Sequence, residues 1–225
     1  MIRGKWIHSV LALAVALLVA VPAVGQEDEA AAGHDEEMMQ KWAEYATPGE
    51  GHERLARLVG DWDYTMKWWM SPDAEPEEST GTLSASMTMD GRYLVENWEG
   101  TAMGQPFKGQ GTTGYDNFNQ EYVGTWIDNM STGIMVSTGK YDPEQDALVT
   151  TGTFDDIMTG EKDKTMRGVQ KILDDNTVHF EMYVPGPDGQ EFKTMEIHAV
   201  RTAPPAEGEA APAEQTPPAE PEREY

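Results

Sequence analysis

The sequence predicts an all-β fold, an antiparallel up-and-down β-barrel of about ten strands that is preceded by two short helices. Between residues 61 and 201, apolar residues alternate with polar ones, as they do along half-buried strands. Short turns join these runs, so each strand is expected to pair with the next as a hairpin. Closure into a barrel would remove the exposed edges of such a sheet. Two packed sheets are the structural alternative.

Residues 1–25 have the features of a secretory signal peptide. A positively charged start, with Arg3 and Lys5, precedes an unbroken apolar run over residues 10–20, and small residues follow near the expected cleavage site. The run is too short for a transmembrane helix. We therefore expect export to the periplasm or the extracellular space, without stable membrane insertion. Residues 26–34 are small and acidic, which is typical of a disordered leader.

Residues 35–60 are expected to form two helices that pack on the barrel. In the first half of this segment, apolar residues recur with the spacing of one helix face. Thr47 is placed to cap the second helix, Pro48 suits its first position, and Glu50 would complete a capping box. Gly60 is the expected end of this helix.

Residues 61–201 are expected to form the barrel domain. The first strand, residues 61–70, alternates clearly, and Asp90-Gly91 is a strong signal for a two-residue hairpin turn. Several strands contain glycines, which permit the bends that a small barrel needs. These glycines are Gly109, Gly111, Gly114, Gly124, Gly139, Gly152 and Gly168. Residues 202–225 are rich in Ala, Pro and Glu, and a disordered tail is expected there.

The composition limits the possible partners. With 40 acidic and 16 basic residues, the formal net charge is −24, which disfavours binding to nucleic acid. The chain has no cysteine, so disulfides and thiolate metal sites are excluded. We expect no cofactor and no metal. Nothing in the sequence indicates an oligomeric state.

Two family resemblances add to this reading. Gly60-Asp61-Trp62 at the start of the first strand and Arg201 at the end of the last resemble the lipocalins and their calycin relatives, in which such an Arg packs over the Trp. The segments TPGEGHERLARLVGDWDY, MDGRYLVE, GYDNFNQEYVGTWIDNMSTGI and MEIHAVR more closely resemble the bacterial domain-of-unknown-function 1579 family, over residues 38–201. That family has no established activity. The lipocalin resemblance implies a barrel with structural roles for Gly60, Trp62 and Arg201, and the second resemblance implies no catalytic residue.

The expected barrel interior is aromatic and rich in methionine. Such an interior suits a small apolar or amphipathic ligand, although a barrel of this size is also often filled by its own side chains. The candidate ligand contacts are Trp62, Tyr64, Met66, Trp68, Met87, Trp98, Tyr115 and Trp126.

We interpret the protein as a non-enzymatic barrel that binds one small molecule. In a first alternative, a calycin-like enzyme or a haem-binding barrel would use His52 or His198 for a polar or haem contact. His52 shares a helix face with Leu55, and His198 is expected on the same side of the last strand as Phe192. In a second alternative, the barrel is filled by side chains and acts as an interaction module.

A catalytic pair of carboxylates is not expected. Asp116 and Asp128 stand at turns on opposite ends of a short strand, where their side chains would form Asx turns. The sequence also contains no nucleophile elbow, phosphate-binding loop or cluster with metal-ligand spacing.

Overall fold

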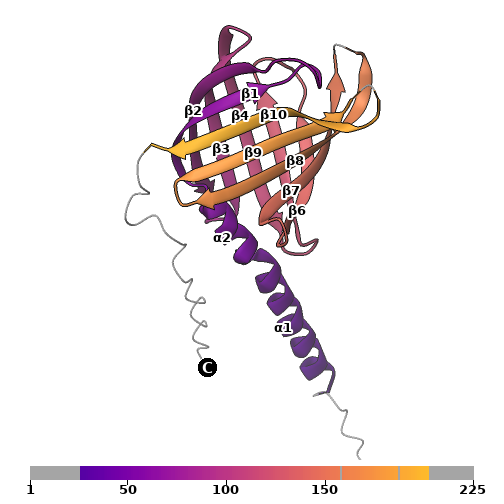
Figure 1. Ribbon diagram of the computed structural model, residues 1–225. Coiled ribbons are helices and arrows are strands. Elements are labelled where there is room, and N and C mark those ends of the chain that lie inside the picture. The colour runs from indigo at the N-terminus through magenta and orange to yellow at the C-terminus, as the bar shows by residue number, and fades with distance from the viewer. Residues whose placement is uncertain (1–25, 158, 187, 203–225) are drawn as a thin grey trace, which may run out of the picture. The chain divides into compact units, whose positions relative to one another are not determined.

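The computed structural model describes residues 26–157, 159–186 and 188–202. The expected signal peptide and most of the expected tail lie outside these residues. Ten antiparallel strands close into a barrel, in which each strand pairs with its neighbours in sequence and β1 pairs with β10 (Figure 1). The predicted barrel and its strand number are confirmed.

The ten strands follow one another at the spacing that the alternating pattern indicates. Their bounds are β1 (Gly60–Trp68), β2 (Glu77–Thr88), β3 (Tyr93–Ala102), β4 (Gln105–Asp116), β5 (Glu121–Asp128), β6 (Met135–Asp142), β7 (Ala147–Asp156), β8 (Glu161–Asp174), β9 (Thr177–Pro185) and β10 (Glu191–Arg201). The connections alternate between the two ends of the barrel, as the antiparallel pairing requires.

Two helices precede the strands, α1 (Gln26–Ala46) and α2 (Glu50–Ala56). The described residues divide into two compact units on either side of residues 43 and 44, and α2 belongs to the unit of the barrel. The structure includes residues 26–34 in α1, where a disordered leader was expected. A physical reason is their content of Ala and Glu, which are strong helix formers.

The cap of α2 also differs from the prediction. Gly49, not Thr47, is the N-cap residue, and its backbone N–H donates to Nδ1 of His52 at 3.1 Å. A histidine ring therefore fills the place that the sequence assigned to a capping box, and Pro48 stands before the cap.

Helix α2 closes one end of the barrel (Figure 1). Leu55 is 2% exposed and lies in the main core cluster with Trp62 and Leu94. The hydroxyl of Tyr122 on β5 donates to the backbone carbonyl of Gly51 at 3.3 Å, which ties the helix to the wall. This end of the barrel is thus a packed hydrophobic floor.

Gly60, Trp62 and Arg201 form one structural unit at the same end. The Arg201 guanidinium lies 4.0 Å from the ring centre of Trp62 and donates to the backbone carbonyls of Arg57, Val59 and Asp175. Gly60 has a φ of +133°, and a Cβ there would lie 2.2 Å from Nη1 of Arg201. Only glycine satisfies both the backbone conformation and the close approach.

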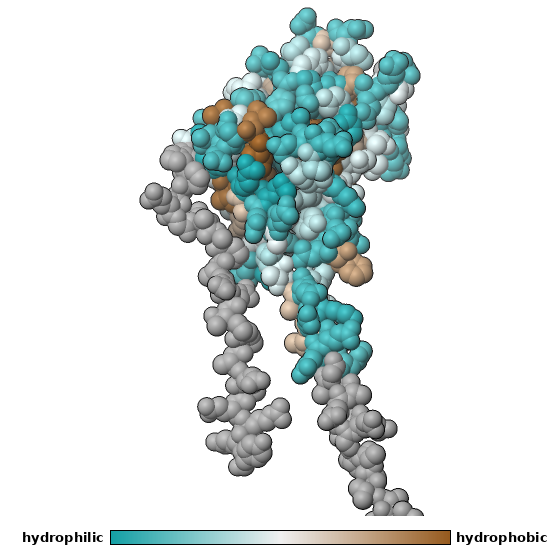
Figure 2. All heavy atoms as spheres, turned by 60° about the horizontal axis from the view of Figure 1, so that its bottom comes forward, coloured by the Kyte–Doolittle hydropathy of each residue, from teal (hydrophilic) through white to brown (hydrophobic). Residues whose placement is uncertain are grey.

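The face of the molecule seen in Figure 2 is largely polar. Hydrophilic side chains cover most of this face, and hydrophobic side chains gather in one patch at its upper left, with a few others apart from it. Within the described part of the chain, neither helix has the length and apolar character needed to span a bilayer.

Candidate ligand-binding cavity

The barrel encloses a cavity of about 1470 Å³. Its lining runs from Leu58, next to α2, to residues of the loops that follow β1, β3, β5, β7 and β9. The described lining includes no residue of the turns at the other end. The cavity therefore has a closed floor at α2 and a mouth formed by five loops. The alternative of a barrel filled by side chains is not correct.

The cavity is widened where small inward residues of adjacent strands lie between larger ones such as Tyr122, Trp126 and Phe154. From β4 to β8 the lining includes Gly111, Gly124, Ser137, Thr150 and Gly168. Facing strands carry large side chains, but the small residues leave them no partner to interdigitate with. Space that interior packing would normally fill stays open.

Aromatic rings form one layer of the wall. Trp98 lies between Tyr64 and Trp126, with ring centroids 5.0 and 6.0 Å apart, and Phe107 stacks on Trp126 at 6.3 Å. The indole of Trp126 lies against the backbone of β4, where a Cβ on Gly109 would be 2.4 Å from a ring carbon. This glycine accommodates an aromatic face, a role beyond the predicted bend.

Trp126 is held by Asp128 from its own strand. The indole N–H donates to Oδ2 of Asp128 at 2.9 Å, while Oδ1 accepts the backbone N–H groups of Met130 and Ser131. The predicted Asx turn at Asp128 is present and also orients a cavity residue. Asp116 forms the corresponding turn with Phe118 at the closed end, so the two carboxylates are apart, as expected.

Six of the eight predicted contact residues line the cavity. They are Trp62, Tyr64, Met66, Trp68, Trp98 and Trp126. Met87 and Tyr115 instead pack against the core cluster below the cavity floor. Tyr115 contacts His52 edge to face at 5.8 Å and lies against Gly51, so α2 occupies the space that a ligand would need.

His52 does not face the mouth or the cavity. It is buried in α2, where Nδ1 accepts the backbone N–H of Gly49 and a second hydrogen bond joins the ring to the backbone of Tyr115. Burial, followed by the nearby charge of Arg92, lowers the pKa of His52. The ring is a neutral cap of the helix in the closed floor.

His198 lies on the outer face of β10. Phe192 and Ile197 line the cavity, whereas His198 is exposed and its ring lies 6.4 Å from that of His179 on β9. The expectation that His198 and Phe192 share a side is wrong because the register shifts between Lys193 and Met195. A single such shift exchanges the faces of all the residues on one side of it.

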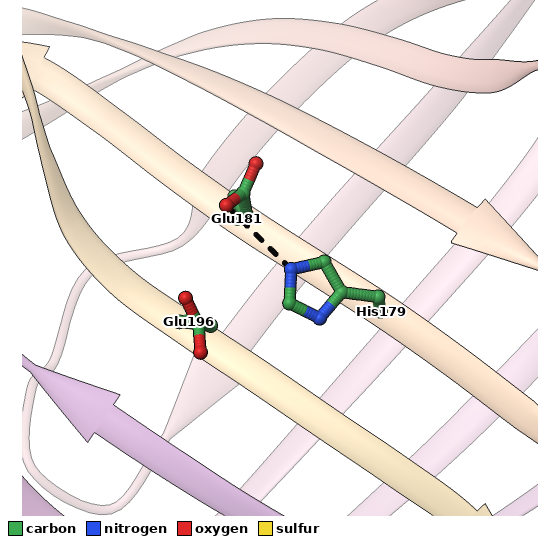
Figure 3. A group of neighbouring side chains, drawn as sticks. All are labelled: His179, Glu181 and Glu196. Atoms are coloured by element: carbon green, nitrogen blue, oxygen red, sulfur yellow. Dashed lines mark ion pairs between the residues drawn. The ribbon is translucent and has the colours of Figure 1, made fainter. Parts of the chain in front are cut away.

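A group of titratable side chains surrounds the outer histidine pair. His179, Glu181 and Glu196 have ligand atoms within 4.8 Å of one another (Figure 3). However, Nζ of Lys193 lies 3.2 Å from Glu181 and contacts Glu196. Its hydrogen bond lowers the pKa of Glu196. The lysine ammonium thus takes the position of a metal cation, and we interpret the cluster as an ion-pair network.

Sequence reasoning missed Glu96 on β3. It lines the cavity, and its cross-strand partners, Ala85 and Gly111, carry no charge. Burial raises the pKa of Glu96 to about 7. Its position two residues before Trp98, on the same face of a strand, was a signal that could have identified it.

Comparisons with known proteins agree with this architecture. The crystal structure of Rv2717c from M. tuberculosis is similar, with a TM-score of 0.53 at 14% identity, over 70% of this chain and all of that one. The S-type phycobiliprotein lyase CPES from Guillardia theta is similar with a TM-score of 0.50 at 12% identity, over 68% of this chain and 93% of that one. At these identities the likeness concerns the fold alone.

The sequence comparisons identify the family. A search of curated proteins gives no match. The family described as "Protein of unknown function (DUF1579)" matches residues 47–201, which include α2 and the whole barrel. The chain therefore belongs to the DUF1579 family.

Proposed function

We propose that this protein is an exported, non-enzymatic binding barrel that holds a small apolar or amphipathic molecule in its cavity. The observation that carries the proposal is the open cavity of about 1470 Å³ within an otherwise closed barrel. Pockets for drug-sized ligands typically measure roughly 300–1,000 Å³, so the space is sufficient for one such molecule. Export is part of the proposal because of the signal-peptide pattern in residues 1–25.

The chemistry of the wall supports an apolar ligand body. Trp62, Trp98 and Trp126 present large apolar surfaces, and Met66 adds a side chain that can adapt its shape. The packed floor under α2 leaves the mouth as the route of entry. A ligand would therefore insert its apolar part first and come to rest against the aromatic layer.

The alternatives that depend on histidine lose their geometric basis. His52 is part of the floor, and His198 is on the outer face of β10. Neither ring lines the cavity, so neither is placed to ligate a haem inside it or to move a proton on a molecule bound there.

The first test is direct. Protein purified from its native compartment should release an organic-extractable molecule that mass spectrometry detects, and the extracted protein should then take up an apolar fluorescent dye. Ser137→Phe would fill part of the cavity and should reduce dye uptake. Thr138→Phe places the same group on the exposed outer face of β6 and should leave uptake unchanged.

Two results would contradict the proposal. One is an empty native protein that also fails to bind any apolar dye. The other is an equal loss of dye uptake in both phenylalanine variants while both retain the circular-dichroism spectrum of the barrel, since binding would then not depend on the cavity.

A further inference from the structure

Glu96 introduces a carboxylate into the cavity, between its floor and the aromatic layer. Along β3, Leu94 belongs to the packed core, Glu96 and Trp98 line the cavity, and all three point inward. Glu96 therefore lies between the hydrophobic floor and the layer of rings, well below the loops of the mouth.

This carboxylate has no ion pair or hydrogen bond with any residue that the structure describes. The other charged lining residues, which are closer to the mouth, all have partners. Lys164 pairs with Asp156 at 3.0 Å and lies 3.7 Å from Glu161. Asp128 accepts the indole N–H of Trp126, and Asp155 accepts a backbone N–H. The carboxylate of Glu96 is thus available to interact with a molecule in the cavity.

The charge of the lining determines which ligand head group can approach. The described lining contains five carboxylates and one lysine, and that lysine is already paired with acidic residues. The whole chain carries a charge of −24. This field attracts cations to the mouth and repels anions such as fatty acids.

An aromatic ring lies near the carboxylate, at Gly111 on the neighbouring strand. The Cβ position of a residue at 111 would lie 3.2 Å from Oε2 of Glu96 and 3.6 Å from Cε3 of Trp126. The carboxylate and the indole therefore flank the same point above Gly111. A carboxylate near an indole is suited to an organic ammonium group, which can form an ion pair with the carboxylate and a cation–π contact with the ring.

We propose that the cavity selects molecules that carry a protonated amine on an apolar body, with the carboxylate of Glu96 as the counter-ion and Trp126 as a second contact. This inference rests on the proposed function, because it assigns the ligand class of the same cavity. The raised pKa of Glu96 supports it, since a buried carboxylate without a counter-ion is the group that a bound ammonium would stabilise.

The experiment compares three probes of equal length, decylamine, decanol and decanoate, with the extracted full-length mature protein at pH 8. Displacement of an apolar dye reports the affinity of each. Decylamine should bind at least tenfold more tightly than decanol, and decanoate should bind least. A charge-assisted hydrogen bond contributes about 1.5–3 kcal/mol, which corresponds to roughly a ten- to hundredfold preference.

Glu96→Gln should abolish the preference for decylamine while it leaves the affinity for decanol within about twofold. Glu99→Gln is the matched control, because it removes one charge from the exposed face of the same strand and should keep the preference. Comparing the two variants separates the effect of the Glu96 carboxylate on decylamine binding from the effect of the overall negative charge of the protein.

The contrary results fall into two kinds, those that contradict the amine assignment alone and one that contradicts the binding function as well. If decanol binds as tightly as decylamine to the unmodified protein, or if Glu96→Gln keeps the preference, the amine assignment is wrong and the binding barrel stands. If decanoate binds most tightly, the assignment is also wrong. If none of the three probes displaces the dye and the dye itself does not bind, the proposed function fails together with the inference.

Discussion

Replacement of Glu96 by Gln should change how the stability of the protein depends on pH. Burial raises the pKa of Glu96 from 4.5 to about 7, so the folded state holds this proton over a range in which the unfolded state has released it. The folded state then binds more protons, and stability falls as the pH rises through that range. With about 1.4 kcal/mol for each pKa unit, the loss amounts to ~3 kcal/mol by pH 8.

The expected result is therefore a difference that grows with pH. Near pH 4 the extracted wild-type protein and Glu96→Gln should be similarly stable, because both side chains are neutral. At pH 8 the variant should be more stable by about 3 kcal/mol. Any cost of burying the amide applies at every pH and does not alter the slope. Urea denaturation followed by tryptophan fluorescence at pH 4, 5, 6, 7 and 8 measures the difference.

The control for this prediction is Glu99→Gln. Its carboxylate is exposed and pairs with Lys108 at 2.9 Å, a surface pair whose loss should change the stability little at any pH. The general acidity of the chain affects all three proteins alike and cancels in the comparison. If Glu96→Gln and the wild type lose stability in parallel from pH 4 to pH 8, the carboxylate is well solvated, and the reasoning about its burial is refuted.

Three further substitutions test other parts of the structure. Arg201→Ala should lower the free energy of unfolding by about 3 kcal/mol, because it removes three hydrogen bonds to backbone carbonyls and the cover over Trp62; a loss below ~1 kcal/mol in urea titration would contradict this role. Gly109→Ala would place a methyl group 2.4 Å from a ring carbon of Trp126, and near-UV circular dichroism should detect a displaced indole; an unchanged spectrum would count against this packing. Lys193→Ala should leave the two carboxylates that it bridges without their cation, so that Zn²⁺ raises the Tm of the variant and not of the wild type; equal shifts in both would contradict the ion-pair interpretation.

The barrel could be predicted because its signals are local and repeated. Each strand carries its own alternation, and turns such as Asp90-Gly91 specify hairpins between neighbours. The unit of Gly60, Trp62 and Arg201 was expected from the resemblance of these positions to the lipocalins. The start of α1 and the cap of α2 were not predicted correctly. At the cap of α2, the ring of His52 accepts the backbone N–H of Gly49, and histidine is not a typical capping residue.

The faces of individual residues depend on register, which one irregularity can change. His198 would share a side with Phe192 if β10 alternated without interruption, but the register shift between Lys193 and Met195 places them on opposite faces. The turn chemistry of this segment contains no sign of that shift. Alternation therefore predicts the face of a residue only as far as the nearest irregularity.

The cavity itself depends on contacts across the barrel that no single strand encodes. Small inward residues such as Gly124, Ser137 and Thr150 are ordinary within their own strands. The space opens because these strands are adjacent, so that their small residues lie next to one another between larger ones such as Trp126 and Phe154. Gly109 was likewise predicted only as a bend point, because its contact with the ring of Trp126 joins two strands and is not visible within the sequence of β4.

Glu96 is a half-buried carboxylate in a part of the cavity wall that is otherwise apolar and aromatic. The chain has 40 acidic residues, so the sequence alone does not distinguish Glu96 from the others. Only the structure shows that its carboxylate lines the cavity without a partner among the described residues. Gln would fit the same space without a charge. Residues that break local consistency at an energetic cost are expected at functional sites. Since this cost falls next to the rings of Trp98 and Trp126, the ligand that offsets it should be one whose charge is positive.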